Sequence, residues 1–193
     1  KTKEFRNNLA KSLYQAGHLT TMQHQHFQFT LSNVSRQFLW TFLHSHPFYN
    51  SEQVSQRYVE VKQGTVAIPP LKGEALETYV NCTSRQSDEY QTLVDLLMPV
   101  VAEEYSKIFP RRNLEDKGTK NALQKKAQEI ARYVLPVATF AYLYHTVNAT
   151  TLFRYYRLCK TLDAPNETSF IVGRMVEEVL KVDPLVEPLF VLG

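Results

Sequence analysis

The chain has 193 residues, of which 44% are hydrophobic, 12% aromatic and 21% charged. This composition is typical of a globular protein, and the length is typical of one domain. A net charge of +3 is too small to indicate a nucleic-acid-binding face. The two cysteines, Cys82 and Cys159, lie far apart in the sequence. They argue against a disulfide framework and favour a reducing cytoplasm as the compartment.

Apolar runs in the chain are short. The longest, over residues 96–102, falls well below the ~20 residues that a membrane-spanning helix needs. Residues 1–4 are polar and lead into an amphipathic segment, unlike a secretory signal. The sequence therefore predicts neither a membrane span nor a secretory signal. Because the first residue is not Met, we also expect that this chain is one half of a longer tandem protein.

The first part of the chain predicts two helices and two extended segments. Residues 5–16 read as a short helix that stops at a glycine. Residues 24–32 alternate between apolar and polar side chains, which is the period of a half-buried strand. Residues 38–43 place apolar side chains at helical spacing. Residues 54–68 are rich in β-branched and aromatic residues and predict an extended segment.

The middle of the chain is predicted to be mainly helical. Residues 74–109 read as helix, with an internal boundary near Thr83 and Ser84 and a kink at Pro99. A polar loop follows. Residues 120–134 then form a second helix that ends before a proline.

The last part of the chain predicts a strand and two helices. Residues 137–147 are β-branched and aromatic and indicate a strand. Asn148 is placed to cap a helix that runs to Leu162. Residues 168–182 make the last helix. This mixture of helices and a few strands that are not adjacent in sequence predicts a single α+β domain over residues 1–193.

Several common catalytic and binding motifs do not occur in the sequence. The six glycines are scattered, so there is no phosphate-binding or dinucleotide-binding glycine cluster. There is no Gly-x-Ser-x-Gly nucleophile motif. Two distant cysteines cannot supply a zinc finger.

Four of the six histidines form two His-x-His pairs, at His24 and His26 and at His44 and His46. Neutral imidazole is a common metal ligand, so the pairs permit a metal site. No carboxylate stands beside them at helical spacing, and polar histidines that line a cleft or an interface are therefore the favoured interpretation.

Arg57 and Arg132 are candidate anion-binding residues. A guanidinium group offers a planar fork of donors that suits phosphates and carboxylates. The alternative for each is an ordinary surface or ion-pair arginine.

The order of several short motifs resembles the flavin-dependent thymidylate synthases, the ThyX or Thy1 family. The match extends over about residues 14–182, and Thr146 to Asn148 correspond to the family's Thr-x-Asn segment. The remaining motifs, in chain order, are Gln23-His24, Phe27-Gln28-Phe29, Val34-Ser35-Arg36, His44-Ser45-His46, Ser55-Gln56-Arg57-Tyr58 and Ala131-Arg132-Tyr133-Val134-Leu135-Pro136.

The resemblance implies an α+β subunit with a small antiparallel sheet packed by helices, including a long helical segment. It also implies a homotetramer whose members bind FAD and dUMP and use methylenetetrahydrofolate and NADPH to make dTMP. The FAD-binding residues implied are His24, His44, His46, Asn148 and Arg154. The dUMP-binding residues implied are Ser55, Arg57 and Arg132.

The sequence departs from the family pattern where charged ligands are held. His44-Ser45-His46 stands in place of Arg-His-Arg, and Cys159 in place of a substrate-binding arginine. Other replacements are Thr41, Thr150, Pro165 and Ser169. We therefore predict a catalytically degenerate domain with a structural or assembly role, as a homo-oligomer or beside an intact domain of the same family. The alternatives are an active flavin-dependent synthase and a nucleotide- or metal-binding domain.

Overall fold

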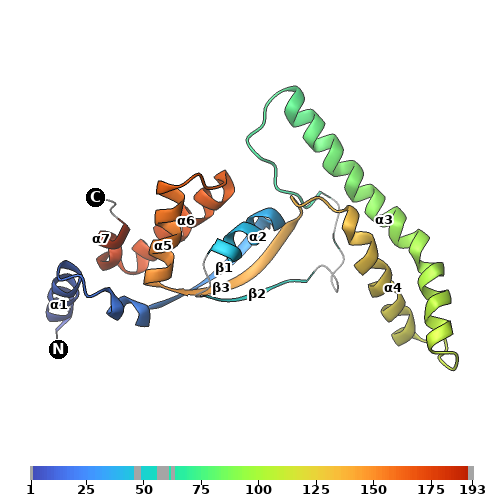
Figure 1. The fold of residues 1–193 in the computed structure, drawn as a ribbon, viewed down its shortest axis with the longest axis horizontal. Helices are drawn as coiled ribbons and strands as arrows, with labels where there is room; N and C mark the ends of the chain where they lie inside the picture. Colours follow the sequence, from blue (N-terminus) through green and yellow to red (C-terminus); the bar gives the residue numbers. More distant parts are fainter. Residues whose placement is uncertain (1, 46–48, 56–60, 62–63, 191–193) are drawn as a thin grey trace. The chain divides into compact units, whose positions relative to one another are not determined.

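The computed structural model describes residues 2–45, 49–55, 61 and 64–190 (Figure 1). The chain divides into two compact units. The first unit consists of Lys1–Leu31, Gln37–Glu52 and Leu143–Gly193. The second unit consists of Ser32–Arg36 and Gln53–Tyr142. The single domain over residues 1–193 stays a prediction.

A small sheet is formed by β1 (His26–Ser35), β2 (Asn50–Gln53) and β3 (Phe140–Asn148), in the order β1-β3-β2. All three strands are antiparallel to their neighbours, and 66% of the described residues are helical. The predicted α+β class with a small antiparallel sheet and a long helix is confirmed. β3 alternates buried and more exposed residues, so one face of it packs against the interior.

β1 carries one extra residue relative to β3. The amide of Ala149 donates to the carbonyl of Gln25 over 3.0 Å, and the amide of Arg36 donates to that of Thr139 over 3.1 Å. Between these two hydrogen bonds β1 advances by eleven residues and β3 by ten. Asn33, which lies within this stretch, has φ 56°, a conformation that asparagine adopts more readily than most residues. A bulge at Asn33 accounts for the extra residue.

The first unit packs short helices around an aromatic core. Phe42 is fully buried, and its ring centroid lies 4.8 Å from that of Phe38 and 4.5 Å from that of Tyr155. The helices of this part of the chain are α1 (Lys3–Gln15), η1 (Leu19–His24), α2 (Arg36–Ser45), α5 (Ala149–Thr161), α6 (Asn166–Val182), η3 (Pro184–Val186) and α7 (Glu187–Phe190).

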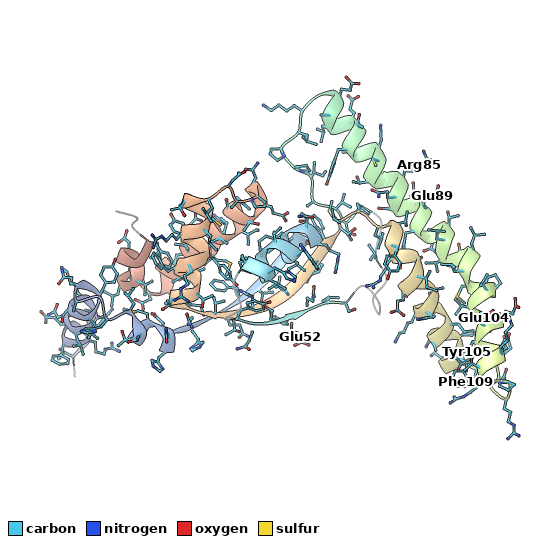
Figure 2. All side chains as sticks on the ribbon, viewed as in Figure 1. Glu52, Arg85, Glu89, Glu104, Tyr105 and Phe109 are labelled. Carbon is cyan, nitrogen blue, oxygen red and sulfur yellow. The ribbon has the colours of Figure 1, made fainter. Side chains whose placement is uncertain are left out.

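The second unit contains a helical hairpin of α3 (Glu74–Ile108) and α4 (Lys117–Ala131), which lie side by side and are followed by η2 (Arg132–Val134) (Figure 1). Asp116 caps α4 by accepting hydrogen bonds from its first turn. Near the end of α3 the rings of Tyr105 and Phe109 lie 4.8 Å apart (Figure 2). The core of the hairpin consists of Tyr90, Val94, Val101, Leu123, Ala127 and Ala131.

One boundary predicted from the sequence is wrong. α3 continues through Thr83 and Ser84, where a break was expected. Thr83 Oγ1 donates to the carbonyl of Tyr79 over 3.0 Å, so its hydroxyl is bonded within the helix and does not end it. The extended segment predicted over 54–68 stays a prediction, because 56–60 and 62–63 lie outside the described residues; β2 lies before it, at 50–53. No helix in the described part of the chain is long and apolar enough to cross a membrane.

Candidate functional site

Six of the eight residues that the resemblance implies for FAD and dUMP lie in the described part of the chain. His46 and Arg57 lie outside the described residues. The first unit holds His24, His44, Asn148 and Arg154, and the second unit holds Ser55 and Arg132. Ser55 is half-buried and Arg154 is exposed on α5.

Strand pairing brings His24 and Asn148 to the same end of the sheet. The residues that follow them, Gln25 and Ala149, share the backbone hydrogen bond described above. Asn148 caps α5, as the sequence predicts, because its Oδ1 accepts a hydrogen bond of 2.8 Å from the amide of Thr151. The side-chain amide nitrogen of Asn148 has no part in this cap bond.

His44 is bonded to its own helix. Its Nδ1 lies 2.6 Å from the carbonyl oxygen of Trp40, and the two ring centroids are 4.3 Å apart. In the other His-x-His pair, His26 Nδ1 lies 3.2 Å from the carbonyl oxygen of His24. Within the described residues no cluster of three or more His, Cys, Asp or Glu could hold a metal ion.

A pocket of about 190 Å³ lies between α2, α5 and the start of α6. Its lining includes Thr41, Cys159 and Pro165, three positions at which the resemblance predicts a departure from the family pattern, together with Thr168 and Asp163. We call it the thiol pocket. Packing thus brings Thr41 of α2 next to Cys159 and Pro165, which lie far from it in the sequence.

The thiol pocket is weakly polar and has no basic side chain among its described lining residues. Thr41 Oγ1 lies 3.4 Å from Thr168 Oγ1. Burial raises the pKa of the Cys159 thiol, against smaller opposing effects of Ser169 and Lys160. Asp163 is the charged residue among the described lining residues, and its formal charge is negative. This lining suits a neutral group better than a phosphate.

Two arginines of the second unit, Arg36 and Arg132, repel each other electrostatically. Arg36 is half-buried, and burial, followed by the charge of Arg132, lowers its pKa. Arg132 Nε donates to the carbonyl of Glu129 over 3.1 Å. Neither guanidinium belongs to an ion pair among the described residues. The pair of Arg36 and Arg132, here the arginine pair, is an arrangement that an anion would stabilise.

Sequence reasoning missed Arg36 as a site residue, although it belongs to the Val-Ser-Arg motif that carries the resemblance. It also missed His145, which is fully buried. Burial lowers the pKa of His145 to about 4. Its Nδ1 shares a hydrogen bond with Ser51 Oγ, whereas its Nε2 has no partner among the described atoms. The alternation of β3 was the signal that could have placed His145 on the inner face.

Comparison with known proteins gives consistent matches. The family described as Thy1, thymidylate synthase complementing protein, matches residues 1–185. A flavin-dependent thymidylate synthase of Clostridium tetani (strain Massachusetts / E88) is 29% identical over 181 residues, or 92% of this chain and 68% of that protein. A flavin-dependent thymidylate synthase of Mycolicibacterium gilvum (strain PYR-GCK) is 25% identical over 174 residues, or 89% of this chain and 62% of that protein. The chain thus spans about two thirds of the length of these relatives.

Proposed function

The chain belongs to the Thy1 family, and from this premise we propose that it is a catalytically degenerate member with a structural role in a larger assembly. Its partner in that assembly is a second copy of the chain or an intact domain of the same family. Its two free cysteines, one exposed and one half-buried, suit a reducing cytoplasm.

The observation that carries this proposal is the lining of the thiol pocket. The resemblance implies a substrate-binding arginine where Cys159 stands and a glutamine at both Thr41 and Pro165, and these three positions line one pocket. The loss of an arginine that bonds to an anion costs about 1.5–3 kcal/mol. Asp163 adds a negative charge to the lining, which opposes an anionic ligand.

The residues that the resemblance implies for FAD also support a degenerate site. His44 replaces an arginine, and its Nδ1 is within hydrogen-bond distance of the Trp40 carbonyl. Asn148 Oδ1 is used by the cap of α5. The two relatives are flavin-dependent thymidylate synthases. In this chain the donor set does not fit a pyrophosphate held by two arginines, and we derive no step through a flavin.

Binding measurements test the proposal directly. The purified chain is incubated with excess FAD, passed over a desalting column and examined for flavin absorbance, which we expect to be absent. Stoichiometric flavin that survives the column would contradict the proposal. In parallel, equilibrium dialysis with labelled dUMP measures the affinity of the unmodified chain, which we expect to be weak because the thiol pocket offers no cation.

A matched pair of variants tests whether the thiol pocket is responsible for the weak binding of dUMP. Cys159→Arg restores a cation there, and we expect it to bind dUMP at least tenfold more tightly than the unmodified chain. Cys82→Arg adds the same charge on the exposed surface of α3 and should leave dUMP binding unchanged. Equal gains from both variants would show that the thiol pocket is not responsible.

The arginine pair favours a second candidate function, the binding of a nucleotide phosphate without turnover. Arg36 is half-buried, and its pKa is lowered by burial and by Arg132, so an anion between the two guanidinium groups would relieve repulsion. Arg132 is one of the residues that the resemblance implies for dUMP. Thermal shift with inorganic phosphate and with dUMP tests this candidate, because a ligand that binds only the folded state raises its stability.

A further inference from the structure

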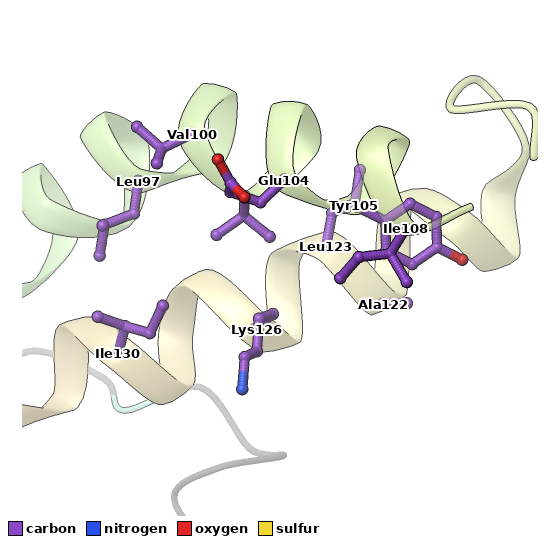
Figure 3. A pocket seen from close by; sticks show the side chains of 10 residues that line it. Leu97, Val100, Glu104, Tyr105, Ile108, Ala122, Leu123, Lys126 and Ile130 are labelled. Carbon is purple, nitrogen blue, oxygen red and sulfur yellow. The ribbon is translucent and has the colours of Figure 1, made fainter. Parts of the chain in front are cut away.

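Two cavities in the described part of the chain differ in the charge of their lining residues. The larger, of about 420 Å³, is a groove between α3 and α4 in the second unit (Figure 3). Glu104 stands on its α3 wall and Lys126 on its α4 wall. Their formal charges cancel, so the groove does not select for a cation or an anion. The thiol pocket of the first unit has Asp163 as the charged residue among its described lining residues, and it therefore favours one sign of charge.

The walls of the thiol pocket are mainly apolar. They include Tyr155, Leu158, Leu162, Pro165 and Val172. At about 190 Å³ the pocket is smaller than the roughly 300–1,000 Å³ of sites that hold drug-sized ligands. It therefore suits a small ligand with an apolar body.

Two hydroxyl groups of α2 in the thiol pocket are placed to accept hydrogen bonds. Thr41 Oγ1 donates within α2, to the carbonyl of Gln37 over 3.1 Å or to that of Phe38 over 3.0 Å. Ser45 Oγ donates to the carbonyl of Phe42 over 2.7 Å. A hydroxyl group has one proton and two lone pairs, so these oxygens act as acceptors toward a ligand.

The other polar groups of the thiol pocket also favour a ligand that donates. Thr168 Oγ1 lies 3.4 Å from Thr41 Oγ1, and a hydrogen bond between them uses the proton of Thr168. Burial raises the pKa of the Cys159 thiol, so the thiol adds no charge at neutral pH. Asp163 is exposed at the pocket, and an ionised carboxylate accepts hydrogen bonds and donates none. The lining is thus rich in acceptors and negative in charge.

We propose that the thiol pocket binds a small organic cation, a primary ammonium group on a short apolar body. An ammonium group has three N–H donors and a positive charge, which match the hydroxyl oxygens and Asp163. The apolar body is removed from water against the leucine and valine side chains of the walls. A metal ion does not suit the pocket, because no group of three or more His, Cys, Asp or Glu among the described residues could hold one. This inference rests on the proposed function, because it gives a ligand class to the pocket on which that function depends.

Three probes of similar size and different charge test the ligand class: butylammonium, butan-1-ol and butyrate. Saturation-transfer NMR titrations in low salt should show butylammonium binding at least threefold more tightly than butan-1-ol, and no detectable binding of butyrate. Added salt should weaken butylammonium alone, because an exposed carboxylate is screened by ions. Equal binding of the ammonium and the alcohol, or no binding of either, would overturn the proposal.

Charge variants at Asp163 test the source of this preference. Asp163→Asn should weaken butylammonium about threefold to fivefold, the range of an exposed ion pair, and leave butan-1-ol unchanged. Asp163→Lys should reverse the order, so that butyrate binds more tightly than butylammonium. Glu177→Gln is the control, because Glu177 is exposed on α6, where it pairs with Arg174 over 2.8 Å. Unchanged binding by Asp163→Asn, or an equal loss in the control, would contradict the assignment.

The cysteine variants of the dUMP experiment separate this inference from the proposed function. Cys159→Arg places a fixed cation in the thiol pocket and should abolish butylammonium binding, whereas Cys82→Arg should leave it unchanged. Turnover of dUMP by a chain that also binds butylammonium through Asp163 would contradict the degenerate role and leave the ligand class standing. A chain that binds neither FAD nor butylammonium would overturn the ligand class and leave the degenerate role standing.

Discussion

The thiol pocket of the first unit and the arginine pair of the second unit differ in charge. Among its described lining residues the thiol pocket has hydroxyls, a thiol and one acid, Asp163. The arginine pair has two guanidinium groups in mutual repulsion, with burial lowering the pKa of Arg36. The lining of the first therefore carries a negative formal charge, whereas the second carries a positive one.

This difference shows that a shared fold does not require a shared site. The strand pairing, the cap at Asn148 and the cores of both units do not depend on the side chains that hold an anionic ligand. Substitutions in the thiol pocket therefore leave the fold intact while they change the chemistry.

The largest effects are expected from the two cores. Phe42→Ala removes a fully buried ring of the first unit and should lower the free energy of unfolding by about 3–5 kcal/mol. Leu123→Ala in the hairpin core, where the side chain is 4% exposed, should lower it by about 2–5 kcal/mol. Urea denaturation measures both, and hydrogen exchange shows whether each loss is confined to its own unit. A loss below 1 kcal/mol for either variant, roughly that of a surface change, would contradict the assigned core.

A pH effect of similar size is expected from His145 in the first unit. Burial among Phe42, Tyr49 and Tyr155 lowers its pKa from 6.5 to about 4. Between these values the unfolded chain binds the proton and the folded chain does not, so stability falls as pH falls. The loss from pH 7 to pH 4 is about 3 kcal/mol.

His145→Phe removes this titration and keeps an aromatic ring in the core. Denaturation at several pH values should show a shallower loss of stability in this variant than in the unmodified chain. The second unit holds no described histidine, so the pH effect should belong to the first unit. Equal slopes for the two proteins would contradict a neutral buried imidazole.

The arginine pair should bind phosphate, and the removal of one of its guanidinium groups should weaken that binding measurably. Arg132→Ala removes one guanidinium group. It should weaken the binding of inorganic phosphate or dUMP by about tenfold to a hundredfold, the equivalent of 1.5–3 kcal/mol. Arg112 is exposed in the loop between α3 and α4, and Arg112→Ala serves as the control. Isothermal titration in low salt measures both. If the two variants bind alike, the arginine pair is not an anion site.

The smallest effects are expected from the helix caps, one in each unit. Asn148→Ala and Asp116→Ala remove the side-chain acceptors at the starts of α5 and α4. Each should cost about 1 kcal/mol. Thermal denaturation measures the loss. A loss of stability at Asp116 without one at Asn148 would show that Asn148 is not needed as a cap and is available to a ligand.

The sequence correctly predicted the elements whose signals lie within a few neighbouring residues. Asn148 precedes an apolar helix and caps it, and alternating residues mark β1. The boundary at Thr83 failed because its hydroxyl bonds back to the helix and the side chain is buried against neighbours that the local sequence does not identify.

The candidate site depended on tertiary packing. Thr41, Cys159 and Pro165 lie on different elements, and only the packing of α2 against α5 and α6 brings them together. His145 stands on an alternating strand, and the burial of that face was predictable. Its bond to Ser51 was not predictable, because the sequence predicted no strand at residues 50–53.

Turnover of dUMP tests the central claim most directly. The purified chain is supplied with saturating FAD, dUMP, methylenetetrahydrofolate and NADPH, and dTMP is measured by chromatography against a buffer control. The account predicts no dTMP above the control, because the thiol pocket lacks the cation that an anionic substrate requires. Sustained dTMP formation that depends on added dUMP and FAD would contradict it.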